Sequence, residues 1–211
     1  MKVGKIEKLC MNNPIRVWVQ RKIESPIMFD GIDLPTNPVC LEIGCGRGVG
    51  LLLINQHFKC KKVVGIDCDP EMIEQAKEYY ANPPRWARDI PKDNIDLKVG
   101  DASNMEFLDE SFDCAFSFGV FHHIKDWQKA ISEVYRVLRP GGYFSIEEFF
   151  LENIIWKIHL QVAKRFGHEP YALLKEKEFR RCLEKNGFSF LKYKKERIPM
   201  SYCHAITRKK G

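Results

Sequence analysis

The sequence lacks three features that would place it in a special class of protein. Its eight cysteines stand singly, with no Cys-x-x-Cys pair of the kind that zinc sites and redox motifs use. Its longest apolar runs have the length of strands, far below the roughly 20 residues that a membrane span needs. It also has no internal repeat and no low-complexity tract. We therefore expect no metal site, no disulfide framework and no transmembrane segment.

Charge and the first residues bear on location and partners. Residues Met1 to Met11 carry lysines and a glutamate but no apolar core, so they do not resemble a secretory signal. We therefore expect a cytoplasmic protein. The net charge of +6 fits a solvated basic surface, and it fits equally well an attraction to an anionic substrate, a nucleic acid or a phospholipid surface. Charge alone does not choose among these partners.

Strand-like and helix-like segments alternate through the middle of the chain, which is typical of a parallel sheet covered by helices. Asp69 is placed to cap one of these helices, and Pro70 takes its first position, where the missing N–H costs nothing. Arg139-Pro140-Gly141-Gly142 should stop another helix sharply. The expected strands are 39–43, 62–66, 95–99, 112–118 and 143–148, and the expected helices between them are 49–58, 70–80 and 127–138.

Further elements lie outside this alternation. Helices are expected at 14–24, at 154–166 and at 176–186, the last ending at Gly187, followed by an antiparallel hairpin of strands 189–197 and 202–208 at the sheet edge. The fold class is thus α/β: a Rossmann-like, doubly wound, seven-stranded sheet, mostly parallel with a C-terminal antiparallel hairpin. We expect a single domain over 1–211, made of an N-terminal helical cap (1–36), a cofactor-binding core (37–150), a lid-like insert (151–175) and a C-terminal helix and hairpin (176–211).

A glycine-rich turn, Glu42-Ile43-Gly44-Cys45-Gly46-Arg47-Gly48, follows the first expected strand. Glycine allows positive φ and leaves no Cβ in the way of a ligand, and in an open parallel sheet such a turn lies at the edge where ligands bind. The dinucleotide fingerprint Gly-x-Gly-x-x-Gly fails, because Val49 or Leu51 stands where the third glycine would be. No Gly-Lys-Ser/Thr follows, so the turn is not a P-loop. A dinucleotide oxidoreductase is therefore disfavoured.

Acidic residues follow the next two strands. Asp67 comes roughly 20 residues after the turn, where a carboxylate grips both ribose hydroxyls in this architecture. Asp101 ends the third strand and is placed to accept a hydrogen bond from an adenine amine. Together with Glu42, these acids predict a site for an adenosine that carries a positive charge.

Five motifs, in the correct order over about residues 37–150, resemble those of the class I S-adenosylmethionine-dependent methyltransferase family, in its small-molecule type. They are Val39-Cys40-Leu41-Glu42-Ile43-Gly44-Cys45-Gly46-Arg47-Gly48, Val64-Gly65-Ile66-Asp67-Cys68-Asp69-Pro70-Glu71-Met72, Gly100-Asp101-Ala102, Asp113-Cys114-Ala115-Phe116-Ser117-Phe118 and Leu138-Arg139-Pro140-Gly141-Gly142.

The resemblance implies S-adenosylmethionine as cofactor, with S-adenosylhomocysteine as product, and it assigns roles to residues. The glycine-rich turn would hold the methionine part, Asp67 the ribose, and Asp101 with Ala102 the adenine. Cys68 and Met72 would line the adenosine, and the backbone carbonyl of Phe118 would meet the amino group. The implied cofactor-binding residues are Glu42, Gly44, Cys45, Gly46, Gly48, Asp67, Cys68, Met72, Asp101, Ala102 and Phe118.

Catalysis and acceptor binding have weaker signals. Methyl transfer from a sulfonium is an in-line displacement that mainly requires alignment and exclusion of water, so a catalytic residue need not exist. His122 and His123 are weak candidates for orienting or deprotonating an acceptor, against the alternative that one caps a turn and the other packs. For the acceptor we select Trp18, Phe121, His168 and Tyr171.

The sequence therefore predicts a methyltransferase (EC 2.1.1.-) that acts on a small or medium organic acceptor. Two alternatives stay open. One is a lipid or quinone methyltransferase that touches a membrane surface through the basic helix Arg16–Lys22. The other is a non-catalytic S-adenosylmethionine-binding protein. Nucleic acid is a poor candidate substrate, because no recognition module is appended. A monomer and a homodimer fit equally well.

Overall fold

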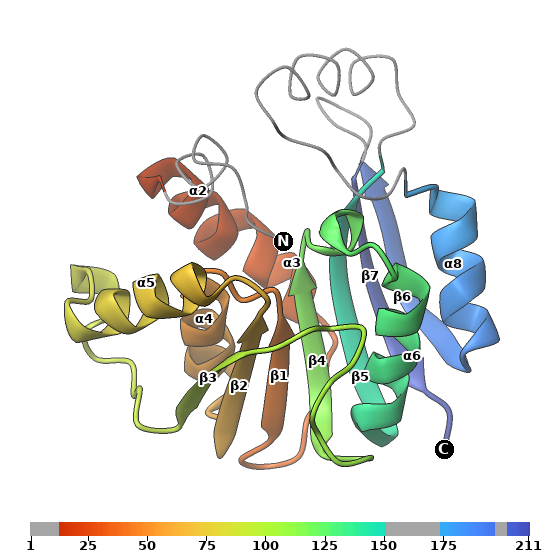
Figure 1. Cartoon of the computed structure of the whole chain (residues 1–211), viewed down its shortest axis with the longest axis horizontal. Coiled ribbons are helices and arrows are strands. Elements are labelled where there is room, and N and C mark those ends of the chain that lie inside the picture. Colours follow the sequence, from red (N-terminus) through yellow and green to blue (C-terminus); the bar gives the residue numbers. More distant parts are fainter. Residues whose placement is uncertain (1–12, 151–173, 197–201) are drawn as a thin grey trace.

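The computed structural model describes residues 13–150, 174–196 and 202–211, and its centre is a seven-stranded sheet (Figure 1). The strand order is β3-β2-β1-β4-β5-β7-β6, and the strands β1 to β5 run parallel. β7 is antiparallel to both of its neighbours. The strands are β1 (Val39–Ile43), β2 (Lys62–Asp67), β3 (Ile95–Val99), β4 (Phe112–Phe118), β5 (Leu138–Phe149), β6 (Phe188–Glu196) and β7 (Tyr202–Lys209). This arrangement confirms the predicted fold class.

Helices cover both faces of the sheet (Figure 1). The chain begins with α2 (Pro14–Val19), a π-helical turn η1 (Gln20–Glu24) and α3 (Ser25–Phe29). Then come α4 (Val49–Phe58), α5 (Pro70–Ala81), α6 (Trp127–Val137) and α8 (Glu176–Lys185), with short 3-10 turns η2 (Arg85–Ala87) and η3 (Phe121–His123). No helix in the described part of the chain is long and apolar enough to cross a membrane.

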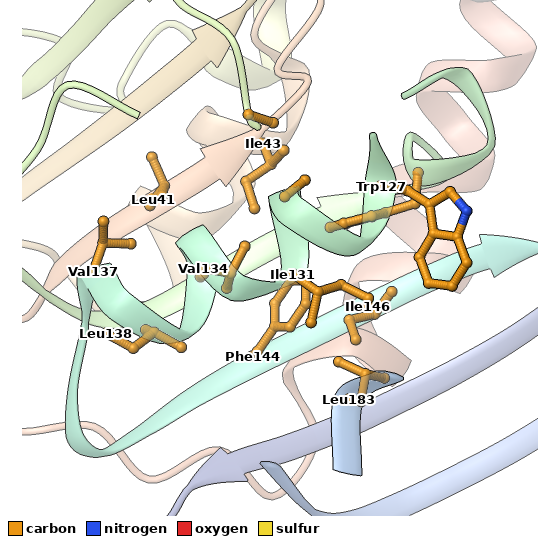
Figure 2. Packing of buried hydrophobic residues seen from close by; sticks show 14 of the residues in the cluster. Leu41, Ile43, Trp127, Ile131, Val134, Val137, Leu138, Phe144, Ile146 and Leu183 are labelled. Carbon is orange, nitrogen blue, oxygen red and sulfur yellow. The ribbon is translucent and has the colours of Figure 1, made fainter. Parts of the chain in front are cut away.

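Two buried clusters hold these layers together. On one face α6 and α8 pack against the sheet, where Ile131 and Val134 meet Phe144 of β5 (Figure 2). On the other face α3 and α4 bring Phe29 and Leu51 onto β1 and β4. Because successive strand residues point to opposite faces, neighbouring residues of one strand serve both clusters. The carboxyl ends of β1, β2 and β3 border an open cleft.

Most element positions match the sequence prediction. β1, α4, β3 and β4 have the predicted bounds. Asp69 caps α5 as expected, since the backbone N–H of Glu71 donates to its Oδ1 at 3.0 Å, and Pro70 is the first helical residue. Gly187 follows α8 with a φ of +100°. The predicted helix 154–166 and the turn Pro199-Met200-Ser201 lie outside the described residues.

Two segments differ from the prediction. β5 begins at Leu138 rather than at 143, because Leu138 pairs with Phe112 across a bulge and keeps the Pro140 segment extended. The N-terminal helix does not end at 24 but continues through η1 to Phe29. Pro26 cannot donate a backbone hydrogen bond, and the wider π turn before it accommodates that loss without ending the helix.

Candidate functional site

A cleft of about 550 Å³ lies at the carboxyl edge of β1, β2 and β3. We call it the edge cleft. The chain that follows β4 forms its remaining wall. Its lining residues are Ile43, Gly44, Ile66, Asp67, Cys68, Gly100, Asp101, Ala102, Ser103, Val120, His123, Ile124, Lys125 and Asp126. Three consecutive parallel strands therefore supply one site, as the sequence predicts from the placement of its acids.

The glycine-rich turn shapes the floor of the edge cleft. Gly44, Gly46 and Gly48 have φ values of +66°, +51° and +82°, a region that favours glycine. A Cβ on Gly44 would lie 2.3 Å from Cγ2 of Val120, so the β4 loop can approach only because the side chain is missing. A Cβ on Gly46 would meet nothing within 4 Å, which leaves open space beside the turn. The turn is thus closed on one side and open on the other.

Asp67 ties this turn to β2. Its Oδ2 accepts a hydrogen bond from the backbone N–H of Gly46 at 2.9 Å, and its Oδ1 accepts one from the N–H of Asp69 at 2.9 Å. Burial raises the pKa of Asp67, while these two bonds oppose the rise. Each carboxylate oxygen can accept a further bond, so Asp67 can both hold the turn and bind a hydroxyl.

Asp101 lies at the corresponding point on β3. Its Oδ1 accepts hydrogen bonds from the N–H and the hydroxyl of Ser103, at 2.8 and 2.9 Å. Ala102 between them is buried and forms an apolar wall of the cleft. The tight turn leaves the exposed Asp101 beside a flat apolar surface, which suits a purine ring with an exocyclic amine.

Glu42 lies behind the turn rather than in the cleft. Its side chain is 2% exposed, and among the described residues no donor hydrogen-bonds its Oε2. Burial first, and the nearby Asp67 second, raise the pKa of Glu42 well above its usual range. A buried carboxyl oxygen without a donor is costly unless something cationic comes near. This is the electrostatic setting that a positively charged ligand relieves.

The predicted cofactor residues fall into four groups in the structure. Gly44, Asp67, Cys68, Asp101 and Ala102 line the edge cleft. The rest do not line it: Glu42, Cys45 and Met72 are buried behind it, Gly46 and Gly48 form the turn, and Phe118 packs near Phe29, with ring centroids 6.5 Å apart.

The sequence prediction missed the lining residues Ser103, Val120, Ile124, Lys125 and Asp126. Their position just after β3 and β4, at the same sheet edge, is the signal that could have found them.

The two histidines after β4 have different surroundings. His122 Nδ1 lies 2.5 Å from Oε1 of Glu148, whose side chain is fully buried. Glu148 also accepts from the N–H groups of Phe121 and Phe149, at 2.7 and 2.8 Å. A carboxylate fixed in this way orients the imidazole and leaves Nε2 as the reactive nitrogen. His123, whose ring centroid is 4.0 Å from that of His122, lines the edge cleft.

The residues selected for the acceptor are scattered. Trp18 is 54% exposed on α2. Phe121 is fully buried and packs against Phe144 and Phe179, so it lies in the core rather than in an open pocket. The apolar side chain of Phe121 therefore serves core packing. His168 and Tyr171 lie outside the described residues.

The edge cleft fits S-adenosylmethionine on these observations. The open space at Gly46 has room for the methionine part, Asp67 can take the ribose, and Asp101 with Ala102 can take the adenine. The orphaned oxygen of buried Glu42 matches the cationic charge. When bound there, the cofactor supplies an electrophilic methyl group.

Comparison with known proteins identifies the class. A family model described as a methyltransferase domain matches residues 41–146, half of the chain. The chain therefore belongs to the class I S-adenosylmethionine-dependent methyltransferase family. The cofactor of this family is S-adenosylmethionine.

Individual relatives cover parts of the chain. A sterol 4-C-methyltransferase of Caenorhabditis elegans is 30% identical over 141 residues, 67% of this chain and 40% of that protein. A phthiotriol/phenolphthiotriol dimycocerosates methyltransferase of Mycobacterium tuberculosis is 31% identical over 122 residues, 57% of this chain and 42% of that protein. This chain thus spans less than half the length of either relative.

Solved structures share the fold. A SAM-dependent methyltransferase from Aquifex aeolicus has a TM-score of 0.72 at 19% identity, covering 98% of this chain and 99% of that one. A (4+2)-cyclase has a TM-score of 0.69 at 16% identity, covering 89% and 80%. Because a protein named for cyclisation shares this fold, the fold by itself does not define the reaction.

Proposed function

We propose that this chain transfers the methyl group of S-adenosylmethionine to an organic acceptor with a large apolar part. One observation carries the proposal: the glycine-rich turn, Asp67 and Asp101 meet in a single cleft of about 550 Å³ at the edge of the sheet. The chain's own contribution is to bind, align and exclude water, since a neutral thioether leaves without acid catalysis.

The experiment is a transfer assay with a panel of acceptors. Release of S-adenosylhomocysteine would be measured with sterols, long-chain alcohols and aromatic hydroxyls, each offered in solution and in lipid vesicles. We expect turnover with at least one apolar acceptor. Asp101→Ala should lose cofactor binding, whereas Asp96→Ala, on the outer part of β3, should not. Cofactor binding without turnover on any acceptor would favour a non-catalytic binding protein.

His122 is our candidate for orienting or deprotonating the acceptor. Its imidazole is held by the buried Glu148, and general bases of this kind contribute about 10²-fold or more. We therefore expect His122→Ala to lower kcat roughly a hundredfold while the affinity for S-adenosylmethionine stays unchanged. His57→Ala, on the exposed face of α4, is the matched control. An equal kcat in both variants would remove His122 from the reaction.

A lipid acceptor is the second candidate, because both relatives above are named for lipid substrates. The first helix offers a different surface from the one predicted. Arg16 pairs with Glu24 at 2.5 Å, and Arg21 stacks on Trp86 at 4.0 Å, so these two cations turn toward the protein. Ile15 and Trp18 are exposed, at 75% and 54%, and of the predicted basic residues Lys22 stays exposed with them. Faster turnover of vesicle-borne than of soluble acceptors would support this candidate.

A further inference from the structure

A second cavity, of about 480 Å³, lies next to β5 and β7 at the same end of the sheet. Its apolar walls are Ile15, Val19 and Ile23, which recur at four-residue spacing along α2 and η1, together with Phe149 of β5. One acid from β5, Glu147, also lines it. We call it the Glu147 cavity.

Glu147 is the unusual member of this lining. Its side chain is 1% exposed, and among the described residues none hydrogen-bonds its Oε2. His204 Nδ1 is 3.9 Å from that oxygen, too far for a hydrogen bond. Burial, and then the charge of Glu24, raise the pKa of Glu147 well above its usual range. A buried carboxyl oxygen in this state needs a hydrogen-bond partner, an acceptor when it is protonated and a donor when it is ionised, and the cavity in front of it can hold one.

The sheet register places this cavity beside the edge cleft. Ile43 pairs with Ser117, and Phe118 pairs with Glu147, so Gly44, Phe118 and Glu147 are level on three neighbouring strands. With strands about 4.8 Å apart, the backbones of Gly44 and Glu147 are roughly 10 Å from each other. Gly119 follows Phe118 of β4 and lets Phe149, a wall of the Glu147 cavity, pack closely, because a Cβ there would lie 2.7 Å from the Phe149 ring.

The charges around Glu147 define the polar group that it receives. Arg16 and Glu24 both line the cavity and pair with each other at 2.5 Å, so their charges compensate. Because burial favours the protonated form of Glu147, an ammonium ion or a carboxylate entering here would lose its hydration without meeting an opposite charge. A hydroxyl carries no charge, donates to an ionised carboxylate and accepts from a protonated one, so it suits Glu147 in either state.

We propose that the Glu147 cavity binds a hydroxyl-bearing apolar molecule, with its hydroxyl on Glu147 and its apolar body against Ile15, Val19, Ile23 and Phe149. The inference rests on the proposed function only in taking this molecule to be the methyl acceptor. Glu147 is then a specificity-determining residue, two strands away from the turn that would hold the donor. Nothing in the binding itself requires methyl transfer.

The test is direct binding, measured by isothermal titration calorimetry on the full chain without cofactor. Decanol is the probe, and decyl methyl ether, decylammonium and decanoate have the same chain with other head groups. We expect decanol to bind roughly tenfold more tightly than each of the other three, the ratio that one hydrogen bond supplies. Equal binding of decanol and the ether, or preference for either ion, would overturn the assignment.

Two variants separate recognition of the ligand's head group by Glu147 from packing of its chain against the apolar walls of the cavity. Glu147→Met keeps the volume and removes a buried carboxyl, so it should fold at least as stably and lose the preference for decanol over the ether. Val19→Trp should fill the cavity and abolish binding of both probes. Glu74→Met, at an exposed acid of α5, is the matched control and should behave as the wild type.

An unchanged preference in Glu147→Met would refute the proposal. Decanol binding without turnover in the transfer assay would refute only the proposed function.

Discussion

At the scale of single residues, the site depends on glycines that leave room for neighbouring side chains. Glu42 can be buried behind the glycine-rich turn because Gly50 of α4 has no Cβ. A Cβ at that position would lie 2.1 Å from Oε1 of Glu42 and 2.6 Å from its Cδ. Gly50 thus has a packing reason to stand inside a helix, where glycine is otherwise unfavourable.

This contact predicts the effect of Gly50→Ala. The change would ordinarily stabilise a helix by up to about 1 kcal/mol, but here it should destabilise the protein by roughly 1–3 kcal/mol, because the buried carboxyl has to move. Urea unfolding of the cofactor-free protein measures the difference. In a Glu42→Ala background, where the obstacle is gone, Gly50→Ala should be neutral or stabilising. The same loss in both backgrounds would contradict the explanation.

At the scale of elements, helix α6 fixes the connection between β3 and β4. Arg136 donates to the carbonyls of Met105 and Phe107 at 2.9 and 2.7 Å, and to the carboxylate of Glu133. Glu133 in turn accepts from the N–H of Met105 at 2.8 Å. One planar guanidinium therefore joins the helix to the loop that follows Ala102 and Ser103, two residues of the edge cleft.

We expect Arg136→Lys to lower the free energy of unfolding by roughly 1–3 kcal/mol, because an ammonium group cannot reproduce this fork of hydrogen bonds. Cofactor affinity should fall as well, since the loop carrying Ser103 loses its anchor. Arg139→Lys is the matched control: the Arg139 side chain is 44% exposed where it pairs with Asp113, so this substitution should cost less than about 1 kcal/mol. Chemical denaturation and calorimetric titration provide both measurements.

The sequence predicts elements whose signal is local. Apolar runs bounded by glycine or a cap placed β1 and α4, and Asp69 with Pro70 placed the start of α5. The early start of β5 could not be predicted, because the pairing of Leu138 with Phe112 is a tertiary contact that overrides the Pro140-Gly141 signal.

In the site, too, local signals were predictable and tertiary contacts were not. The acids at strand ends were predictable from strand order alone, and five of the predicted cofactor residues line the edge cleft. The partner of His122 was not predictable, since Glu148 lies 26 residues further along the chain. The Glu147 cavity was missed for a similar reason: its walls come from the first helix, from β5 and from β7, which are far apart in the sequence.

At the scale of the whole molecule, buried acids make stability depend on pH. Burial raises the pKa values of Glu42, Asp67 and Glu147 in the folded state. A raised pKa contributes stability that is complete below the unfolded value, 4.5 for a glutamate, and is lost as the pH rises through the folded value. Glu133 and Glu176, whose pKa values are lowered, act the other way and lose their contribution as the pH falls below 4.5.

We therefore expect the free energy of unfolding of the cofactor-free protein to decline from about pH 5 to about pH 8. Glu42→Gln removes one buried ionisation, so its stability should decline less steeply and exceed that of the wild type at the upper end. Urea unfolding at several pH values tests this. Glu74→Gln, at an exposed acid, should follow the wild type, and parallel curves for all three proteins would argue against buried acids as the cause.

Because β7 lies between β5 and β6 in the sheet, the last two strands cannot pair in the order in which they are synthesised. β6 leaves the ribosome first, yet in the described sheet its neighbour is β7, so it has no strand to join until β7 has also emerged. Until then the outer edge of β5 stays open, and open strand edges invite pairing between chains. Glu147 and Glu148 stand on that edge, where their charges would discourage such pairing in the nascent protein. We therefore expect these two acids to limit pairing between chains during synthesis, independently of any role in the folded protein.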